Sequence, residues 1–410
     1  MLVCGLDIGT TKTTAVIAEV SGTSFAPQMK IVGVGRSRAS GMRRGIVRDI
    51  DETTRAIREA VAAAERMAGF KIDSVHVGMP GEHVNYVTSP GVVNVSGREV
   101  TEADRKRVIE VAMAVVLPAD SEILHTLPQE YLVDRQRGIA DPVGMTGTRL
   151  EVDVCIVTMS STAAQNLRKA VERAGYSIAG FVLEPLAASM AVITEDEREL
   201  GVALVELGGG STDLVIFQDG KFRHVNTIGF AGGHITSDIA QGLSVTQADA
   251  EGLKAQYGVA YPPLVDPSEM IELPGTQGQG PRQVARELIA NIIHPRLDEI
   301  LGMVSRQIER VGYSGKLAAG VVLTGGTAQM RGVTELAREV FAMPVRVGQP
   351  GAGITGSLVD HVEQPRFATA TGLALFGMQQ AARGQEKAGA GALSLDRLSG
   401  SVRKWLTEFF

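Results

Sequence analysis

The stretch GLDIGTTKTTAVIAEV, residues 5–20, recurs in altered form as ELGVALVELGGGSTDL, residues 199–214. In each copy an apolar run leads into an acidic residue and a glycine-containing turn, and a second apolar run leaves the turn. Asp7 aligns with Glu206 at an offset of 199 positions, and the glycines that follow align in the same way. Each copy is typical of a strand, a tight polar turn and a second strand. The sequence therefore predicts two similar half-molecules.

The two turns carry the residue types that bind phosphate. Glycines let the backbone approach an anion closely and direct its N–H groups inward. Hydroxyls and a lysine add further donors to phosphate oxygens. Two such turns facing each other would hold one polyphosphate between the two halves. The predicted nucleotide-binding residues of the turns are Gly9, Thr10, Thr11, Lys12, Gly208, Gly209, Gly210, Ser211 and Thr212.

A third loop and one helix complete the predicted nucleotide site. Gly325 and Gly326 follow the apolar run 321–323, and we predict that they lie close to the base and ribose. Glu251 and Lys254 lie three residues apart on a predicted helix, so they share a face. Contact with ribose and base is one interpretation of that pair, and a surface ion pair is the other.

Carboxylates near the turns are candidates for metal binding and for catalysis. Asp7 is predicted to hold magnesium through water molecules, because magnesium gives up its hydration reluctantly. A turn-capping aspartate is the alternative. Glu184 begins a predicted helix between the two halves and is a candidate for positioning an attacking water. The alternative for Glu184 is a helix-start carboxylate favoured by the helix dipole.

No serine–histidine or cysteine–histidine pair stands out in the sequence as a nucleophile with its base. Any hydrolysis would then depend on positioned water and phosphate electrostatics. The net charge of −6 over 410 residues gives no reason to expect nucleic-acid binding. Cys4 and Cys155 lie in apolar strand-like runs and are predicted to be buried, reduced thiols.

No run of about 18 apolar residues occurs in the sequence. The N-terminus also lacks the pattern of a secretory signal. We therefore expect a cytosolic chain, unless something tethers it to a membrane.

Hydrophobic periodicity predicts alternating strands and helices, and so a mostly parallel sheet in each half. Residues 84–95 are expected to form a hairpin, followed by a helix whose capping box begins at Thr101. Its predicted apolar stripe ends at Val116. The charged stretch 195–199 is interpreted as a surface hinge. Other helices are expected over residues 50–68, 161–174, 184–193, 232–243, 246–257 and 283–311, with a Pro/Gly-rich loop over 262–281.

The C-terminal end has the pattern of an amphipathic helix on a linker. Residues 379–392 have no apolar period and are predicted to be a flexible linker. In residues 393–410, the apolar side chains share an arc of about 140° at 100° per residue. The basic residues can reach a surface beside it. An interfacial membrane helix is favoured over a helix packed on its own core. The predicted membrane-binding residues are Leu395, Leu398, Val402, Arg403, Lys404, Trp405, Leu406, Phe409 and Phe410.

These features resemble the actin, sugar-kinase and heat-shock-chaperone superfamily, and within it most closely the FtsA family of bacterial cell-division proteins. Beyond the two stretches already quoted, four segments carry the resemblance. They are LPQEYLVD at 127–134, DPVGMTGTRLEVDV at 141–154, AGGHITSDIA at 231–240 and LTGGTAQMRGV at 323–333. Together with the tail, the segments cover nearly the whole chain.

The resemblance implies an α/β, two-lobed actin-like (duplicated ribonuclease-H-like) fold with an inserted small α+β subdomain. The implied first lobe is 1–83 and 163–197, with a connecting helix at about 366–378. The implied insertion is 84–162. The second lobe is 198–230 and 306–365, with a helical subdomain at 231–305, the linker at 379–392 and the membrane-targeting helix at 393–410.

The resemblance also implies ligands and partners. ATP and Mg²⁺ are the expected cofactors. The expected partners are the C-terminal peptide of FtsZ, further copies of the chain in a filament, an anionic lipid surface and later division proteins. Arg286 and Arg296 are candidate contacts for the FtsZ peptide, although ordinary solvated helix charge is the alternative. The expected location is the cytoplasmic face of the inner membrane at the division site.

One residue departs from the superfamily's pattern. The second loop usually begins with aspartate, and here it begins with Glu206. The extra methylene displaces the carboxylate by roughly a bond length. We therefore expect ATP binding but at most weak hydrolysis, with Glu206 and Glu184 as the candidate catalytic groups. A small-molecule kinase of the same fold and an actin-like pilus-assembly scaffold are the alternative functions.

Overall fold

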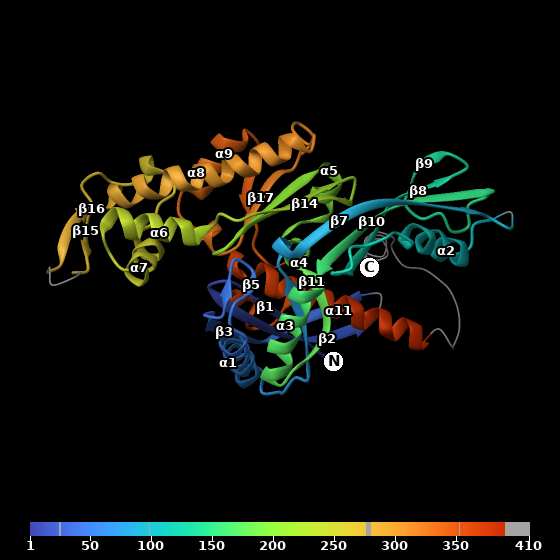
Figure 1. The fold of residues 1–410 in the computed structure, drawn as a ribbon, viewed down its shortest axis with the longest axis horizontal. Helices are drawn as coiled ribbons and strands as arrows, with labels where there is room; N and C mark the ends of the chain where they lie inside the picture. The colour runs from blue at the N-terminus through green and yellow to red at the C-terminus, as the bar shows by residue number, and fades with distance from the viewer. Residues whose placement is uncertain (24–25, 98, 276–279, 352, 390–410) are drawn as a thin grey trace.

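The computed structural model describes residues 1–23, 26–97, 99–275, 280–351 and 353–389. Two sheets form the centre of the molecule, and α11 (Ala368–Gly389) packs on the strands of the first lobe and on α4 (Glu184–Val192). A small α+β unit with β7–β10 and α2 projects from one side (Figure 1). A unit with α6, α7 and a short hairpin projects from the other side, and the long helix α8 extends along it (Figure 1). The phosphate-type turns therefore lie near the middle of an elongated body.

The sheet of the first lobe has the strand order β11-β6-β1-β2-β3-β19 among its described strands. The strands β1, β2 and β3 form an antiparallel meander, whereas the pairs β1–β6, β6–β11 and β3–β19 are parallel. The sheet is therefore mixed, and the expectation of a mostly parallel sheet holds only outside the β1–β2–β3 meander. Consecutive strands joined by tight turns pair antiparallel. The strands are β1 Leu2–Ile8, β2 Lys12–Thr23, β3 Ala26–Arg38, β6 Ser74–Met79, β11 Ser177–Leu183 and β19 Ile354–Thr355.

Helices cover the first sheet because small residues let them approach. Asp49 caps α1 by accepting the N–H of Glu52, and Gly69 ends the helix at φ 74°. A Cβ at Gly35 of β3 would lie 1.9 Å from the Ala60 carbonyl oxygen of α1. Only glycine allows this contact between helix and strand. The helices of this lobe are α1 Ile50–Ala68, α3 Ser161–Ala174, α4 Glu184–Val192 and α11 Ala368–Gly389.

The sheet of the second lobe repeats this pattern, with described order β14-β13-β12-β17-β18 and an antiparallel meander β12-β13-β14. Residues 195–199 form α5 and not the expected hinge. The side chain of Glu197 accepts the N–H of Thr194 in a capping box, and Arg198 is buried against Phe217. The elements are α5 Glu195–Leu200, β12 Val202–Leu207, β13 Thr212–Gln218, β14 Lys221–Ile228, β17 Gly320–Thr324, α9 Val333–Phe341, β18 Val345–Val347 and α10 Val359–Val362.

The side unit next to the second lobe is not entirely helical as expected. Glu272 pairs with Gln283 in a hairpin, so the long helix begins at Arg286 and not at 283. The hairpin also replaces part of the loop predicted over 262–281. The elements are α6 Gly232–Leu243, α7 Gln247–Tyr257, β15 Met270–Leu273, β16 Arg282–Ala285 and α8 Arg286–Arg310.

The inserted α+β unit has one sheet of order β7-β10-β8-β9 with α2 packed on one face. Residues 84–94 form a single strand paired along its length with β10, so the predicted hairpin is wrong. The capping box of Thr101 and Asp104 is confirmed. Val116 lies beyond α2 and is fully exposed. The elements are β7 Val84–Asn94, α2 Glu102–Met113, β8 Ser121–Val133, β9 Gln136–Ile139 and β10 Arg149–Ser160.

Helix α11 continues beyond the predicted connecting helix to Gly389. The flexible linker predicted over 379–392 is therefore wrong up to residue 389, because alanine, glutamine, glutamate, lysine and arginine favour a helix despite the missing apolar period. Residues 390–392 and the predicted membrane helix 393–410 lie outside the described residues. Cys4 and Cys155 are buried free thiols, as predicted.

Candidate functional site

The two glycine turns close in the same way and face each other. The N–H of Gly9 donates to the Lys12 carbonyl at 3.1 Å, and the N–H of Gly208 donates to the Ser211 carbonyl at 3.0 Å. A Cβ at Gly210 would lie 2.3 Å from the Thr10 hydroxyl oxygen. The duplication seen in the sequence therefore exists in space, and the two lobes meet where these turns touch.

A cavity of about 580 Å³ lies between the lobes at this contact. Nearly all of the predicted nucleotide site lines it. Thr212 does not, because its side chain is buried on the other face of β13 and its hydroxyl donates to the Phe230 carbonyl at 2.8 Å. The predicted residues that line the cavity are Asp7, Gly9, Thr10, Thr11, Lys12, Glu184, Glu206, Gly208, Gly209, Gly210, Ser211, Glu251, Lys254, Arg286, Gly325 and Gly326.

Four carboxyl groups line the cavity, Asp213 buried and the other three half-buried. Burial raises the pKa of Asp7 to about 7, of Glu206 to about 8 and of Asp213 to about 6. Burial also raises the pKa of Glu184 well above its usual range, with the charges of the other three adding to the effect. These groups share a small, poorly solvated volume, so their negative charges oppose one another.

Two of these carboxyl groups have an oxygen without a partner among the described residues. They are Oε1 of Glu184 and Oε2 of Glu206, whose Oε1 accepts the Thr369 hydroxyl at 2.5 Å. A hydrated divalent cation would satisfy such oxygens and neutralise the charge. Within the described ranges, no three histidine, cysteine or acidic side chains are grouped as direct metal ligands. The unpartnered oxygens of Glu184 and Glu206 fit a hydrated divalent cation.

Asp213 was not predicted as a site residue. It pairs with Glu206 across the β12–β13 turn, so both side chains lie on the same face of the hairpin. It accepts hydrogen bonds from the hydroxyls of Thr227 at 2.5 Å and Ser211 at 3.0 Å. The hairpin register of the second loop was the signal that could have identified it.

The opposite part of the cavity is formed by α7 and the loop after β17. Lys254 Nζ lies 2.7 Å from Glu251 and donates to the Gly232 carbonyl at 3.0 Å. Gly325 has φ 87°, and a Cβ there would lie 2.6 Å from the Leu207 carbonyl oxygen. The pair on α7 is thus both an ion pair and part of the cavity wall, and its contact with ribose and base stays a prediction.

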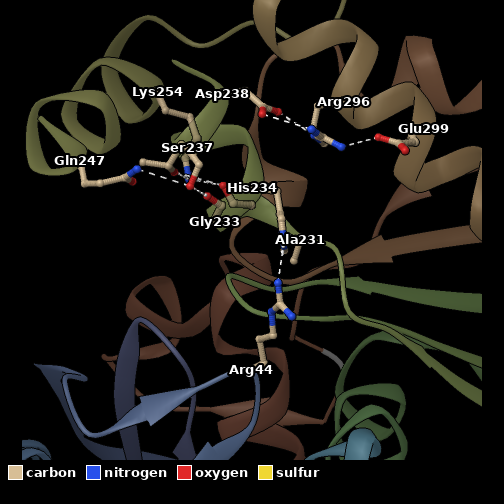
Figure 2. A network of polar contacts seen from close by, with 12 residues as sticks. Arg44, Ala231, Gly233, His234, Ser237, Asp238, Gln247, Lys254, Arg296 and Glu299 are labelled. Carbon is tan, nitrogen blue, oxygen red and sulfur yellow. Dashed lines mark hydrogen bonds and ion pairs between the residues drawn. The ribbon is translucent and has the colours of Figure 1, made fainter. Parts of the chain in front are cut away.

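Arg286 and Arg296 are both held by carboxylates. Arg286 donates two hydrogen bonds to Glu269 at 2.9 Å and one to the Tyr257 carbonyl at 3.0 Å, and it lines the cavity. Arg296 donates to Asp238 at 2.6 and 3.1 Å and to Glu299, as Figure 2 shows. Arg296 does not line the cavity.

One side-chain contact joins the hairpin between β4 (Met42–Arg43) and β5 (Ile46–Val47) to α6 across the lobes. Arg44 Nη2 lies 3.2 Å from His234 Nε2 (Figure 2). The N–H of Ala231 donates to His234 Nδ1 at 3.2 Å when a neutral ring carries its proton on Nε2, facing the guanidinium. Burial and then Arg44 lower the pKa of His234. Arg44 can donate to Nε2 only when the ring proton is on Nδ1, so the neutral ring accepts from either Arg44 or Ala231 but not from both at once.

Over the part of the chain that the structure describes, no helix combines the length and the apolar character that crossing a membrane requires.

Comparison with known proteins places the sequence among cell-division proteins. The family profile for cell division protein FtsA matches residues 203–372, and that for the SHS2 domain inserted in FtsA matches residues 81–158. The FtsA protein of Pseudomonas aeruginosa is 41% identical over 391 residues, which cover 95% of this chain and 93% of the relative. That of Neisseria meningitidis is 43% identical, covering 90% and 88%. That of Escherichia coli K12 is 37% identical, covering 99% and 96%.

Solved structures share the fold at low sequence identity. The PilM–PilN type IV pilus biogenesis complex matches with a TM-score of 0.64 and 19% identity, covering 92% of this chain and 98% of that chain. MreB 5 of Spiroplasma citri bound to AMPPNP matches with a TM-score of 0.55 and 15% identity, covering 94% and 98%. The predicted fold class, an actin-like two-lobed body with an inserted subdomain, is confirmed.

Proposed function

This chain belongs to the FtsA family of cell-division proteins, and on that premise we propose that it binds ATP with magnesium in the interlobe cavity. We propose further that it polymerises on the cytoplasmic face of the inner membrane and anchors the FtsZ ring there.

The observation that carries the nucleotide proposal is the contact of the two glycine turns, which both line the interlobe cavity. Backbone N–H groups, two threonine hydroxyls and Lys12 approach it from one lobe, and the Gly208–Ser211 turn approaches from the other. A polyphosphate between the turns would accept hydrogen bonds from both lobes. Occupancy of the cavity would therefore favour the closed arrangement of the lobes.

Asp7, Glu184, Glu206 and Asp213 are the residues that would surround a hydrated magnesium ion. When bound, the metal neutralises charge on the phosphate oxygens. Glu184 lies at the start of α4, and a Cβ at Gly78 would come within 2.7 Å of its Cγ. A glycine at 78 thus leaves room for that side chain. Glu184 is the proposed group that orients an attacking water, with Glu206 beside it.

The proposed hydrolysis is weak. Glu206 is held by the hydroxyl of Thr369, which fixes one oxygen and leaves the longer side chain little freedom to change its position. A carboxylate displaced by one methylene misplaces water and metal for an in-line attack. Binding is affected less, because the phosphate donors come mostly from the turns.

Attachment and partners rest on sequence pattern and family membership. The apolar and aromatic face of residues 393–410 is the proposed membrane contact, and its weak individual binding would gain from a filament's many copies. The side unit with α6–α8 is the proposed dock for the FtsZ C-terminal peptide, near Arg286 and Arg296. Later division proteins are further proposed partners. We assign the units as lobe one 1–83 and 163–197, insertion 84–162, lobe two 198–230 and 306–365, and helical unit 231–305.

Nucleotide titration tests the central proposal. Full-length protein is titrated with a fluorescent ATP analogue plus magnesium, in wild type and in Gly209→Ala. A Cβ at Gly209 would lie 2.6 Å from Thr11 Cγ2, so we expect affinity to fall at least tenfold. Gly252→Ala is the matched control, because its added Cβ meets nothing within 4 Å. Absence of binding to wild type, or equal affinity in all three proteins, would refute the proposal.

Peptide binding tests the FtsZ proposal. Arg296→Ala is compared with Arg306→Ala, which removes an exposed charge from the same helix. Loss of affinity for the FtsZ peptide in the first and not in the second is expected. Equal affinity in both would remove Arg296 from the dock.

A further inference from the structure

Arg36 and Arg366 lie between two cavities. Neither arginine belongs to the sequence motifs or to the proposed nucleotide contacts. Arg36 belongs to β3, and Arg366 lies in the turn just before α11. Both line the interlobe cavity and also a second cavity of about 440 Å³. The remaining lining of the second cavity is Val34, Met67, Asp360, His361, Gln364 and Phe367.

The two guanidinium groups are gathered on one aromatic ring. The Cζ atom of Arg36 lies 5.4 Å from the centre of the Phe367 ring, and that of Arg366 lies 5.8 Å from it. Stacking on an aromatic face favours each guanidinium. Stacking on one ring also holds the two positive charges close together in partly buried positions. The repulsion between them disfavours the charged forms.

Neither guanidinium forms an ion pair with any of the described residues. Arg366 Nη2 donates to Gln364 Oε1, while its buried Nε has no acceptor among the described atoms. Asp360 lines the second cavity but makes no ion pair in the described part of the chain. The pKa of Arg36 is lowered by burial and then by Arg366. The positive charge here is therefore not compensated.

The two arginines also act electrostatically on Lys12 in the glycine turn of the first lobe. Burial lowers the pKa of Lys12, and Arg36 and Arg366 lower it further. Asp7, Glu206 and Asp213 raise the pKa of Glu184, whereas Arg36 and Arg366 lower the pKa of Lys12. The lining is thus segregated into an acidic group, which fits a cation, and a basic group, which fits an anion.

We propose that Arg36 and Arg366 form a second anion subsite, separate from the two glycine turns, that holds orthophosphate beside the bound nucleotide. Guanidinium groups present planar pairs of N–H donors that match phosphate oxygens. Phosphate would supply the acceptor that Arg366 Nε lacks and would relieve the repulsion between the two arginines. The inference rests on the proposed nucleotide site, since the subsite adjoins that cavity. The phosphate comes either from solution, through the second cavity, or from bound ATP after water has hydrolysed its terminal phosphate bond and left ADP.

Phosphate titration of the full-length protein tests the subsite. Orthophosphate is titrated by calorimetry into protein saturated with magnesium and ADP. We expect Arg36→Gln and Arg366→Gln each to weaken phosphate binding at least tenfold, while ADP affinity changes by less than threefold and so reports a folded protein. Arg366→Lys keeps the charge and should lose less affinity than Arg366→Gln. Arg38→Gln is the matched control, because Arg38 is exposed on the same strand and lines neither cavity.

The outcomes separate the possible sources and the two proposals. ADP binding without any phosphate binding, or equal phosphate affinity in wild type and both glutamine variants, overturns the subsite. A preference for ATP over ADP that disappears in the variants, together with a parallel fall in ADP affinity, also overturns it. That result would show that the arginines hold the nucleotide's own phosphates. Failure of ADP to bind wild type refutes the proposed function instead. Arginine-dependent phosphate binding without ADP would still support the subsite.

Discussion

Raising the pH from 7.0 to 8.5 should tighten binding of the magnesium–nucleotide complex, because Glu206 must lose its proton to face a cation. Its pKa is raised by burial to about 8 in the free protein. At pH 7.0 only about one molecule in eleven is ionised, which costs the bound state about 1.4 kcal/mol. At pH 8.5 that cost falls to about 0.2 kcal/mol by the same linkage.

The expected gain in affinity follows from these costs. Glu206 contributes about eightfold, and Asp7, with a pKa of about 7, contributes about a further twofold. Calorimetry at the two pH values measures the affinity. Repeating each titration in buffers of different ionisation enthalpy measures proton release, which we expect from Glu206 and Asp7 together to be about 1.4 protons at pH 7.0 and about 0.3 at pH 8.5.

Glu206→Gln is the matched control for this prediction. The glutamine Oε1 can still accept the hydroxyl of Thr369, so the hydrogen bond survives while the titrating group is removed. The pH dependence should then lose the eightfold contribution of Glu206 and keep the contributions of Asp7 and Glu184, whose pKa values are also raised. A wild-type affinity that does not change with pH, or proton uptake on binding, would refute the assignment of Glu206 to the cation.

Three further predictions concern the same framework. Gly210→Ala would place a Cβ 2.3 Å from the Thr10 hydroxyl, so we expect at least tenfold weaker ATP binding and a loss of about 1–3 kcal/mol in urea unfolding; unchanged values would contradict the contact. Tyr86→Phe removes the 2.7 Å hydrogen bond to His224 between β7 and β14 and should lower the free energy of unfolding by about 1 kcal/mol, measured in urea. Glu206→Asp should raise steady-state ATP turnover while ATP affinity stays nearly unchanged, and equal turnover would disprove the role given to the extra methylene.

Much of the site could be predicted because it is local in sequence. Each glycine turn lies between two strands of one hairpin, so its backbone geometry follows from a few consecutive residues. Thr212 was assigned wrongly to the cavity lining because side chains alternate along a strand. Ser211 lines the cavity, and the next side chain turns into the core.

The rest of the site depends on contacts between distant segments. Arg36 and Arg366 belong to no motif, and only the packing of both on Phe367 brings them together. The polar composition of segment 195–199 predicts a hinge, yet a capping box and the buried Arg198 make it a helix. Composition indicates which segments prefer solvent. Helix capping made segment 195–199 a helix, and tertiary contact brought the two arginines together.

Co-sedimentation with anionic liposomes tests the whole account most directly. Full-length protein is compared with a chain ending at Gly389, where the described helix α11 ends, with and without ATP and magnesium. We predict ATP-dependent pelleting with filaments on the lipid for the full-length protein, and loss of pelleting without residues 390–410. Equal pelleting of both chains, or pelleting that ignores ATP, would contradict a nucleotide-dependent polymer held to the membrane by its C-terminal segment.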